Sequence, residues 1–351
     1  MIRPRQKTLR TSAQLLASGL IPKESADPVE ELARKFAIAI TPQMHGLIDE
    51  SNADDPIAAQ FVPSPMEMLD ADDEVEDPIS DSSFTPVRGI VHRYPDRVLL
   101  KPLLVCPVYC RFCFRREVVG PGSQGLSEDE VDAALAYIES REAIWEVVIS
   151  GGDPLILSPR RIRDIMRRLE KIPHVGVVRY HTRVPVVKPE VVTEELIEAL
   201  RIKKAVYIVL HTNHVRELSQ AAKVACAKLI DSGFPMLSQT VLLRGVNAEP
   251  KTLERLFRAL VELRIKPYYL HQGDLAKGTK HFRTSIAEGQ QIMRALRGHV
   301  SGLCQPLYVL DIPGGNGKVP IGPGYLENHG DGNYSVEDYN GIVHRYKDSC
   351  G

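Results

Sequence analysis

The chain has 351 residues, of which 43% are hydrophobic and 25% are charged. This is an ordinary globular mixture, long enough for one large domain or two smaller ones. The formal net charge of −1 gives no indication of a surface for nucleic acid or for an anionic membrane. No apolar run approaches the roughly 20 residues of a membrane-spanning helix. The basic N-terminal segment lacks the apolar core of a secretory signal, and six cysteines in a chain this long do not indicate a disulfide scaffold. We therefore expect a cytoplasmic protein.

An acidic segment separates the N-terminal residues from the rest of the chain. Residues 36–87 contain neither lysine nor arginine, and they include the stretch DADDEVEDP. Such a charged, proline-punctuated segment predicts a loosely structured and solvated connector, with a partner-docking surface as the alternative. We assign residues 1–87 to an N-terminal helical region and this acidic connector.

From residue 97 onward, strand patterns alternate with helix patterns. The predicted strands cover residues 97–105, 145–150, 175–182, 205–211, 234–243, 266–271 and 306–311. The predicted helices cover residues 126–140, 158–172, 193–201, 217–233, 252–265 and 285–298. Ser127 and Glu130 have capping-box spacing, and Gly233 can end the fourth of these helices. This α/β alternation predicts a parallel sheet with helices outside, either doubly wound or a partial barrel.

Motifs with reactive side chains follow the predicted strands. They are CPVYCRFC, SGGDP, HTR, HTNH, HQGD and DIPGGNGK. Because the carboxyl ends of parallel strands share one edge of the sheet, we expect these motifs to meet there.

Three cysteines, Cys106, Cys110 and Cys113, lie in one short loop after the first of these strands. A structural zinc site takes four protein ligands, and this spacing is unusual for zinc. Iron–sulfur clusters are normally held by four thiolates. The loop therefore predicts a 4Fe–4S cluster with one iron left open for an exogenous ligand.

The CPVYCRFC stretch resembles the CxxxCxxC motif of the radical S-adenosylmethionine (SAM) superfamily, in which SAM occupies the open iron. The resemblance implies that the three cysteines are the metal ligands. It also implies a partial (β/α)6 radical SAM barrel over residues 88–300. The SGGDP stretch is similar to the superfamily's GGE-type motif, which implies SAM-binding roles at the following positions: Ser150, Gly151, Gly152 and Asp153.

A glycine-rich turn precedes Lys318 in the stretch PGGNGKVP. Such a turn can approach a phosphate closely, and a lysine there can form a Schiff base with pyridoxal phosphate (PLP), although a solvated loop has the same pattern. The chain is similar to the lysine 2,3-aminomutase family almost end to end, from DPISDSSFTPVRGIVHRYPDRVLL through LSQTVLLRGVN to PGGNGKVP. The resemblance implies that residues 301–351 form a C-terminal PLP-binding segment with Lys318 as the catalytic, PLP-binding lysine.

The same resemblance implies roles for other side chains around the cofactors and substrate. Arg93, Tyr94 and Arg97 would contact PLP, chiefly its phosphate, while His211 and Gln239 would lie beside SAM. Arg115 would grip the substrate carboxylate, since a guanidinium suits bidentate recognition. Asp274 and Asp311 would hold the distant ammonium of lysine.

The implied activity is that of an L-lysine 2,3-aminomutase, an isomerase that converts free L-lysine to L-β-lysine. His271 stands where lysine mutases carry a tyrosine, and YYLHQGD looks more like the branch that supplies β-lysine for elongation factor P. That branch and a mutase for another amino acid are the alternatives. The family also implies a reducing electron donor of the flavodoxin or ferredoxin type and a homo-oligomer. The structural zinc of longer-tailed members is not expected.

Overall fold

A computed structural model of the chain describes residues 7–69, 71–123 and 125–349, so part of the basic N-terminal segment lies outside the described residues. The helices are α1 Ser12–Ala17, α2 Ala26–Lys35, α3 Pro42–His45, α4 Ala58–Phe61, α5 Glu128–Glu139, α6 Pro159–Lys171, α7 Val184–Val187, α8 Glu194–Leu200, α9 Gln220–Asp231, α10 Pro250–Glu262 and α11 Ile286–Leu296. The strands are β1 Ile90–Tyr94, β2 Arg97–Leu103, β3 Glu146–Gly151, β4 Val177–Thr182, β5 Ala205–His211, β6 Met236–Val241, β7 Ile265–His271, β8 Leu307–Asp311, β9 Lys318–Pro320, β10 Leu326–Asn328, β11 Asn333–Glu337 and β12 Val343–Lys347.

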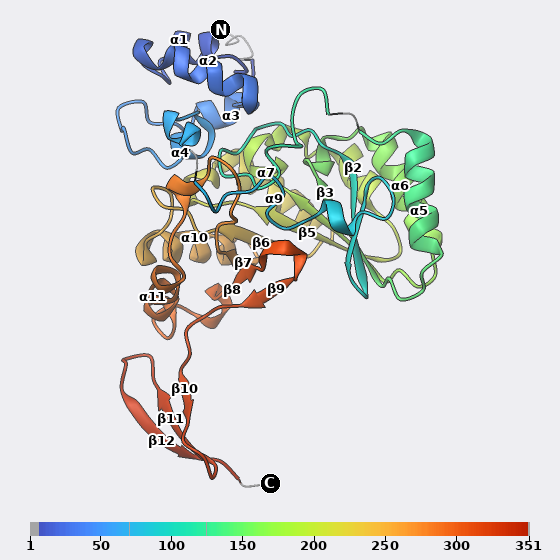
Figure 1. Cartoon of the computed structure of the whole chain (residues 1–351). Coiled ribbons are helices and arrows are strands. Elements are labelled where there is room, and N and C mark those ends of the chain that lie inside the picture. Colours follow the sequence, from blue (N-terminus) through green and yellow to red (C-terminus); the bar gives the residue numbers. More distant parts are fainter. Residues whose placement is uncertain (1–6, 70, 124, 350–351) are drawn as a thin grey trace.

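Strands β1 to β9 form one sheet in which neighbours in sequence are also neighbours in space. Strands β2 to β8 pair in parallel, while β1 and β9 add antiparallel edges. A doubly wound sheet would reverse its strand order at a switch point. The sequential order instead gives a curled, partial barrel with helices outside (Figure 1). The six predicted strand–helix units and the closing strand are confirmed.

Local signals explain why the helices begin, end and pack where they do. Ser127 and Glu130 form the predicted capping box of α5, and Ser158 caps α6 ahead of its first-turn proline. Gly233 has φ +92° just beyond α9, a conformation that glycine adopts without strain. The apolar faces of α5 and α6 are buried in one core cluster with the strands.

The predicted solvated connector is wrong in one respect, because several of its carboxylates are buried ion-pair partners of the barrel. The Glu67 side chain is 0% exposed and pairs with Arg111 and Arg116 on the cysteine loop. Asp55 is likewise buried and pairs with Arg216, more than a hundred residues away. Buried carboxylates need such partners, because desolvation of an unpaired charge is costly. Residues before β1 therefore belong to the packing of the barrel.

The C-terminal strands β10 to β12 form a separate antiparallel sheet that the sequence analysis did not predict. Figure 1 shows it extending away from the barrel. Its outer strands expose apolar side chains, with Leu326 at 62% and Val343 at 63%. In the described ranges, no helix has the length and hydropathy needed to cross a bilayer.

We expect Glu67→Gln to destabilise the chain by about 3–5 kcal/mol, because it leaves two buried guanidinium groups without their counter-ion. Urea-induced unfolding would measure the change. The matched control is Glu254→Gln, which removes an exposed helical pair with Arg258 and should cost no more than about 0.5 kcal/mol. Equal losses for the two variants would contradict the structural role of Glu67.

Candidate active site

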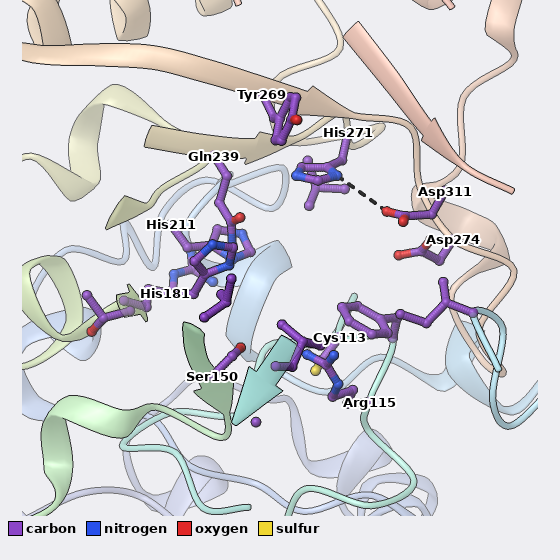
Figure 2. A pocket seen from close by; sticks show the side chains of 18 of the residues that line it. Cys113, Arg115, Ser150, His181, His211, Gln239, Tyr269, His271, Asp274 and Asp311 are labelled. Carbon is purple, nitrogen blue, oxygen red and sulfur yellow. Dashed lines mark ion pairs between the residues drawn. The ribbon is translucent and has the colours of Figure 1, made fainter. Parts of the chain in front are cut away.

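One cavity of about 550 Å³ opens at the carboxyl ends of the parallel strands. Every residue to which the family resemblance gives a role lines it. These residues are Arg93, Tyr94, Arg97, Cys106, Cys110, Cys113, Arg115, Ser150, Gly151, Gly152, Asp153, His211, Gln239, Asp274, Asp311 and Lys318. The fold therefore gathers residues from β1 through β9 around a single space, as Figure 2 shows for ten labelled side chains.

The cysteine loop forms one wall of this cavity. Burial raises the pKa of all three thiols, that of Cys113 to about 11, so ligation to a metal must release protons. Arg183, from the loop after β4, donates from Nη1 to Cys110 Sγ at 2.8 Å. Among the described residues, no three His, Cys, Asp or Glu side chains converge as ligands of a single ion. A cluster differs from a single ion, because each thiolate binds a different iron and the sulfurs stand farther apart.

The SGGDP turn after β3 packs directly against the start of the cysteine loop. The N–H groups of Gly152 and Asp153 donate to the carbonyls of Leu103 and Val105. A Cβ on Gly152 would lie 2.2 Å from the Val105 oxygen, so only glycine permits this approach. Because these two N–H groups are already hydrogen-bonded, the main chain of the turn offers a ligand its carbonyl oxygens. Carbonyl oxygens are acceptors, so they suit a ligand group that donates, such as an amino group.

The Asp153 carboxylate is occupied within the protein. It accepts hydrogen bonds from Thr182 Oγ1 at 2.7 Å and from the backbone N–H groups of Arg183 and Val184 at 2.7 and 3.0 Å. Burial raises its pKa even so. The carboxylate therefore fixes the end of β4 against the end of β3, and contact with a ligand falls to the main chain of the turn.

Neutral polar side chains extend from the next strands. His211 and Gln239 are directly paired in the register of β5 and β6. Burial lowers the pKa of His211 and of His181 well below the usual range, so both imidazoles are neutral. The Nε2 atoms of both histidines are buried without a hydrogen-bond partner among the described residues, and both side chains line the cavity.

The β1–β2 hairpin and the strand of Lys318 meet at one side of the cavity. Tyr94 Oη accepts a hydrogen bond from the backbone N–H of Lys318 at 2.8 Å. The Arg97 guanidinium stacks 3.8 Å from the centre of the Tyr94 ring. Arg93 adds a second cation, and its Nε is buried without a partner in the described chain. Two guanidinium groups thus line the cavity together with Lys318.

Two carboxylates of opposite electrostatic character lie next to this lysine. Asp311 faces Lys318 across the β8–β9 pair, and the Lys318 Nζ lies 2.6 Å from its Oδ1. Although burial opposes ionisation, hydrogen bonding from His271 and the charge of Lys318 lower the pKa of Asp311 to about 2. Burial, and then the charge of Asp311, raise the pKa of Asp274 to about 7. Figure 2 shows the two aspartates side by side.

A carboxylate of the acidic connector positions the arginine of the cysteine loop. Asp81 accepts from Arg115 Nε at 2.9 Å and pairs with Arg93 at 3.3 Å and Lys101 at 3.5 Å. Burial alone would raise the pKa of Asp81, but these three cations hold it below its usual value. Among the described residues, only Nε of Arg115 makes such a bond, so both terminal nitrogens remain available to a carboxylate.

Sequence reasoning gave no specific role to Asp81, His181 or Arg183. The HTR motif that contains the two latter residues was visible at a strand end, which was the available signal. Asp81 had none, because an aspartate in an acidic stretch resembles its solvated neighbours.

Two family models match this chain. The model of the radical SAM superfamily matches residues 100–257, which include the cysteine loop and the SGGDP turn. Together with the partial barrel, this match defines a radical SAM protein. The model described as lysine-2,3-aminomutase matches residues 293–349, which include Asp311 and Lys318.

Named relatives extend the match over most of the chain. It is 39% identical over 323 residues to the L-lysine 2,3-aminomutase of Acetoanaerobium sticklandii, covering 92% of this chain and 78% of that one. Identity to the enzyme of the same name from Methanococcus maripaludis is 42% over 312 residues, or 89% and 72% of the two chains. Identity to the glutamate 2,3-aminomutase of Clostridioides difficile is 36% over 326 residues, or 93% and 77%. The chain belongs to the lysine 2,3-aminomutase family.

The cofactors of this family are a 4Fe–4S cluster, SAM and PLP, and the cavity residues fit them. Three thiols on one wall suit a cluster with an open iron. The unpartnered His211 Nε2 and the main-chain acceptors of the SGGDP turn suit a polar co-substrate. The lysine with two neighbouring guanidinium groups suits an aldehyde that carries a phosphate.

The two aspartates should affect stability in opposite directions. An unfolded aspartate ionises near pH 3.8, whereas folded Asp274 keeps its proton to about pH 7. Ionising Asp274 therefore lowers the free energy of unfolding as the pH rises through this window, and the deficit persists above it. Folded Asp311 ionises near pH 2, so its contribution is favourable at neutral pH and is lost on acidification.

We expect Asp274→Asn to raise the thermal midpoint at about pH 8, with a gain that shrinks toward about pH 4. Asp311→Asn should lower the midpoint at the same alkaline pH, and by less in acid. Calorimetry of the cofactor-free chain at both pH values would measure this. Shifts of the same sign for both variants at alkaline pH would contradict the assignment.

Proposed function

We propose that the chain is an L-lysine 2,3-aminomutase that acts on free L-lysine and yields L-β-lysine. The observation that carries the proposal is the charge pattern of the cavity. Asp274 and Asp311 form a carboxylate pair next to Lys318, while Arg115 supplies a cation on the wall formed by the cysteine loop. A diamino acid is complementary to this pattern, with a carboxylate for Arg115 and a side-chain ammonium for the aspartates.

The charged residues of the cavity have separate tasks in this proposal. Arg115, held at Nε by Asp81, would bind the substrate carboxylate with its terminal nitrogens. The aspartate pair would bind the side-chain ammonium, and ionised Asp274 would be stabilised by that charge. Fixing both ends of a flexible chain leaves its middle carbons in one position, which is the contribution that positioning makes to catalysis.

The cofactor sites would lie on either side of this clamp. Cys106, Cys110 and Cys113 would hold the cluster, the SGGDP turn with His211 and Gln239 would contact SAM, and Lys318 with Arg93, Tyr94 and Arg97 would hold PLP. When bound, the cluster and SAM supply a carbon-centred radical that abstracts hydrogen, and PLP carries the migrating amino group and delocalises the unpaired electron.

A glutamate mutase is the alternative that the relatives raise. Two carboxylates at the far end of the cavity would repel the side-chain carboxylate of glutamate, so the cavity disfavours that substrate. The proposal includes a one-electron donor of the flavodoxin or ferredoxin type and a homo-oligomeric enzyme. The β-lysine could serve elongation factor P, as proteins with a similar YYLH stretch do, without changing the chemistry at the site.

The function is tested by product analysis. After anaerobic cluster reconstitution, the enzyme would receive SAM, dithionite, PLP and each common amino acid in turn, and products would be identified by mass spectrometry with authentic standards. We expect β-lysine from lysine and at least about a hundredfold less product from glutamate, which corresponds to some 3 kcal/mol of discrimination. Preferential conversion of another amino acid would refute the proposal.

Lys318→Ala should abolish β-lysine formation and PLP attachment, because it removes the amine that would form the Schiff base. Among the described residues, β9 has no other lysine paired with Asp311. The visible spectrum of the reconstituted cluster should be unchanged, since the cysteines are intact. Arg201→Ala, at the exposed C-terminal end of α8, is the control for activity lost during purification and cluster reconstitution. Normal turnover in Lys318→Ala would end the assignment of this lysine.

Asp274→Asn should weaken lysine binding by about 2–4 kcal/mol, or roughly 30- to 1000-fold in KM, by removing half of the carboxylate pair. In the parent enzyme, KM for lysine should rise as the pH falls below about 7, where Asp274 becomes neutral. The variant should lack this dependence, while its KM for SAM stays within about threefold. An unchanged KM for lysine would reject the role of Asp274.

A further inference from the structure

A second cavity of about 350 Å³ lies on the other side of the cysteine loop. Residues 106–115 of this loop contribute to the wall of the reaction cavity, and residues 116–121 line the second one. The loop is therefore a partition, with the reaction chamber on one face and the outside surface on the other.

A small apolar cluster lies between Cys106 and this second cavity. Ala39, Tyr109 and Val119 form a small buried cluster against which Cys106 and Ala37 pack. Val119 and Ala37 also line the second cavity. A group docked there would thus be separated from Cys106 by this apolar cluster, and it would not need to enter the chamber that holds substrate.

The rim of the second cavity is positively charged. Arg10, Arg34 and Lys35 line it and are exposed. In the part of the chain that the structure describes, none of their charged nitrogens lies within 4.0 Å of a carboxylate oxygen. Among the described lining residues, only Glu117 carries a carboxylate. Val118, which is 53% exposed, adds an apolar side chain to the lining of this cavity.

We propose that this cavity and its basic rim are the docking surface for an acidic one-electron donor protein of the flavodoxin type. The proposal rests on the proposed function, which needs a reduced cluster. The donor's anionic flavin hydroquinone would lose one electron and become the neutral semiquinone. The oxidised cluster would gain that electron, and no bond or proton would be transferred. Opposite charges steer such encounters and raise their rate.

The test measures electron delivery directly. Anaerobic stopped-flow absorbance would follow bleaching of the reconstituted cluster by flavodoxin hydroquinone in the parent enzyme and in Arg34→Glu/Lys35→Glu. Lys223→Glu/Lys228→Glu, on exposed positions of α9, makes the same change in net charge elsewhere. Arg10→Glu provides a second docking variant outside α2. Dithionite, a small reductant that needs no docking surface, reports whether each variant carries a reducible cluster.

We expect the second-order rate constant for flavodoxin to fall at least about tenfold in both docking variants at low ionic strength, with the difference shrinking as salt is added. The α9 variant should stay within about twofold of the parent. Parent-like rates in the docking variants, an equal fall in the α9 variant, or a parent cluster that flavodoxin does not reduce would overturn the docking surface. If a fully dithionite-reduced parent fails to convert lysine, the proposed function fails instead, whatever the flavodoxin rates.

Discussion

The site depends on carboxylates that reach into the barrel from the segment before it. Glu67 pairs with two arginines of the cysteine loop, and Asp81 pairs with three cations at the edge of the cavity. Guanidinium groups buried without these partners would carry a large desolvation penalty. The loop that holds the three cysteines therefore has its shape because a distant acidic segment folds over it. The connector is a structural part of the reaction chamber.

The partial barrel then divides the tasks among its strand ends. One wall presents thiols, the next presents main-chain acceptors and neutral imidazoles, and the far side presents a lysine between guanidinium groups and carboxylates. Parallel strands bring these groups to one edge although they are spread along most of the chain. The charges alternate around a single cavity, and this gives a small zwitterion one preferred orientation.

Most of the barrel was predictable because its signals are local. Capping residues, apolar periodicity and strand-end motifs lie within a few residues of the elements that they define, and the curled sheet confirmed the number and order of the strand–helix units. The ion pairs of Glu67 and Asp81 were not predictable, because their partners are 12 to 49 residues away and the same acidic segment also contains exposed carboxylates such as Asp72 and Glu76. The strands β10 to β12 were missed for a different reason, since they are short and rich in polar residues, as loops are.

The cross-strand contact between Lys318 and Asp311 bears on how such an enzyme matures. A newly made chain has neither coenzyme nor amino acid in its cavity, yet this carboxylate already has an ammonium group beside it. The ammonium group of Lys318 occupies the position beside Asp311 that the substrate ammonium would take in the proposed function. Under the proposed function, attachment of the coenzyme to Lys318 would remove this ammonium group and release the aspartate for the ammonium of the amino acid.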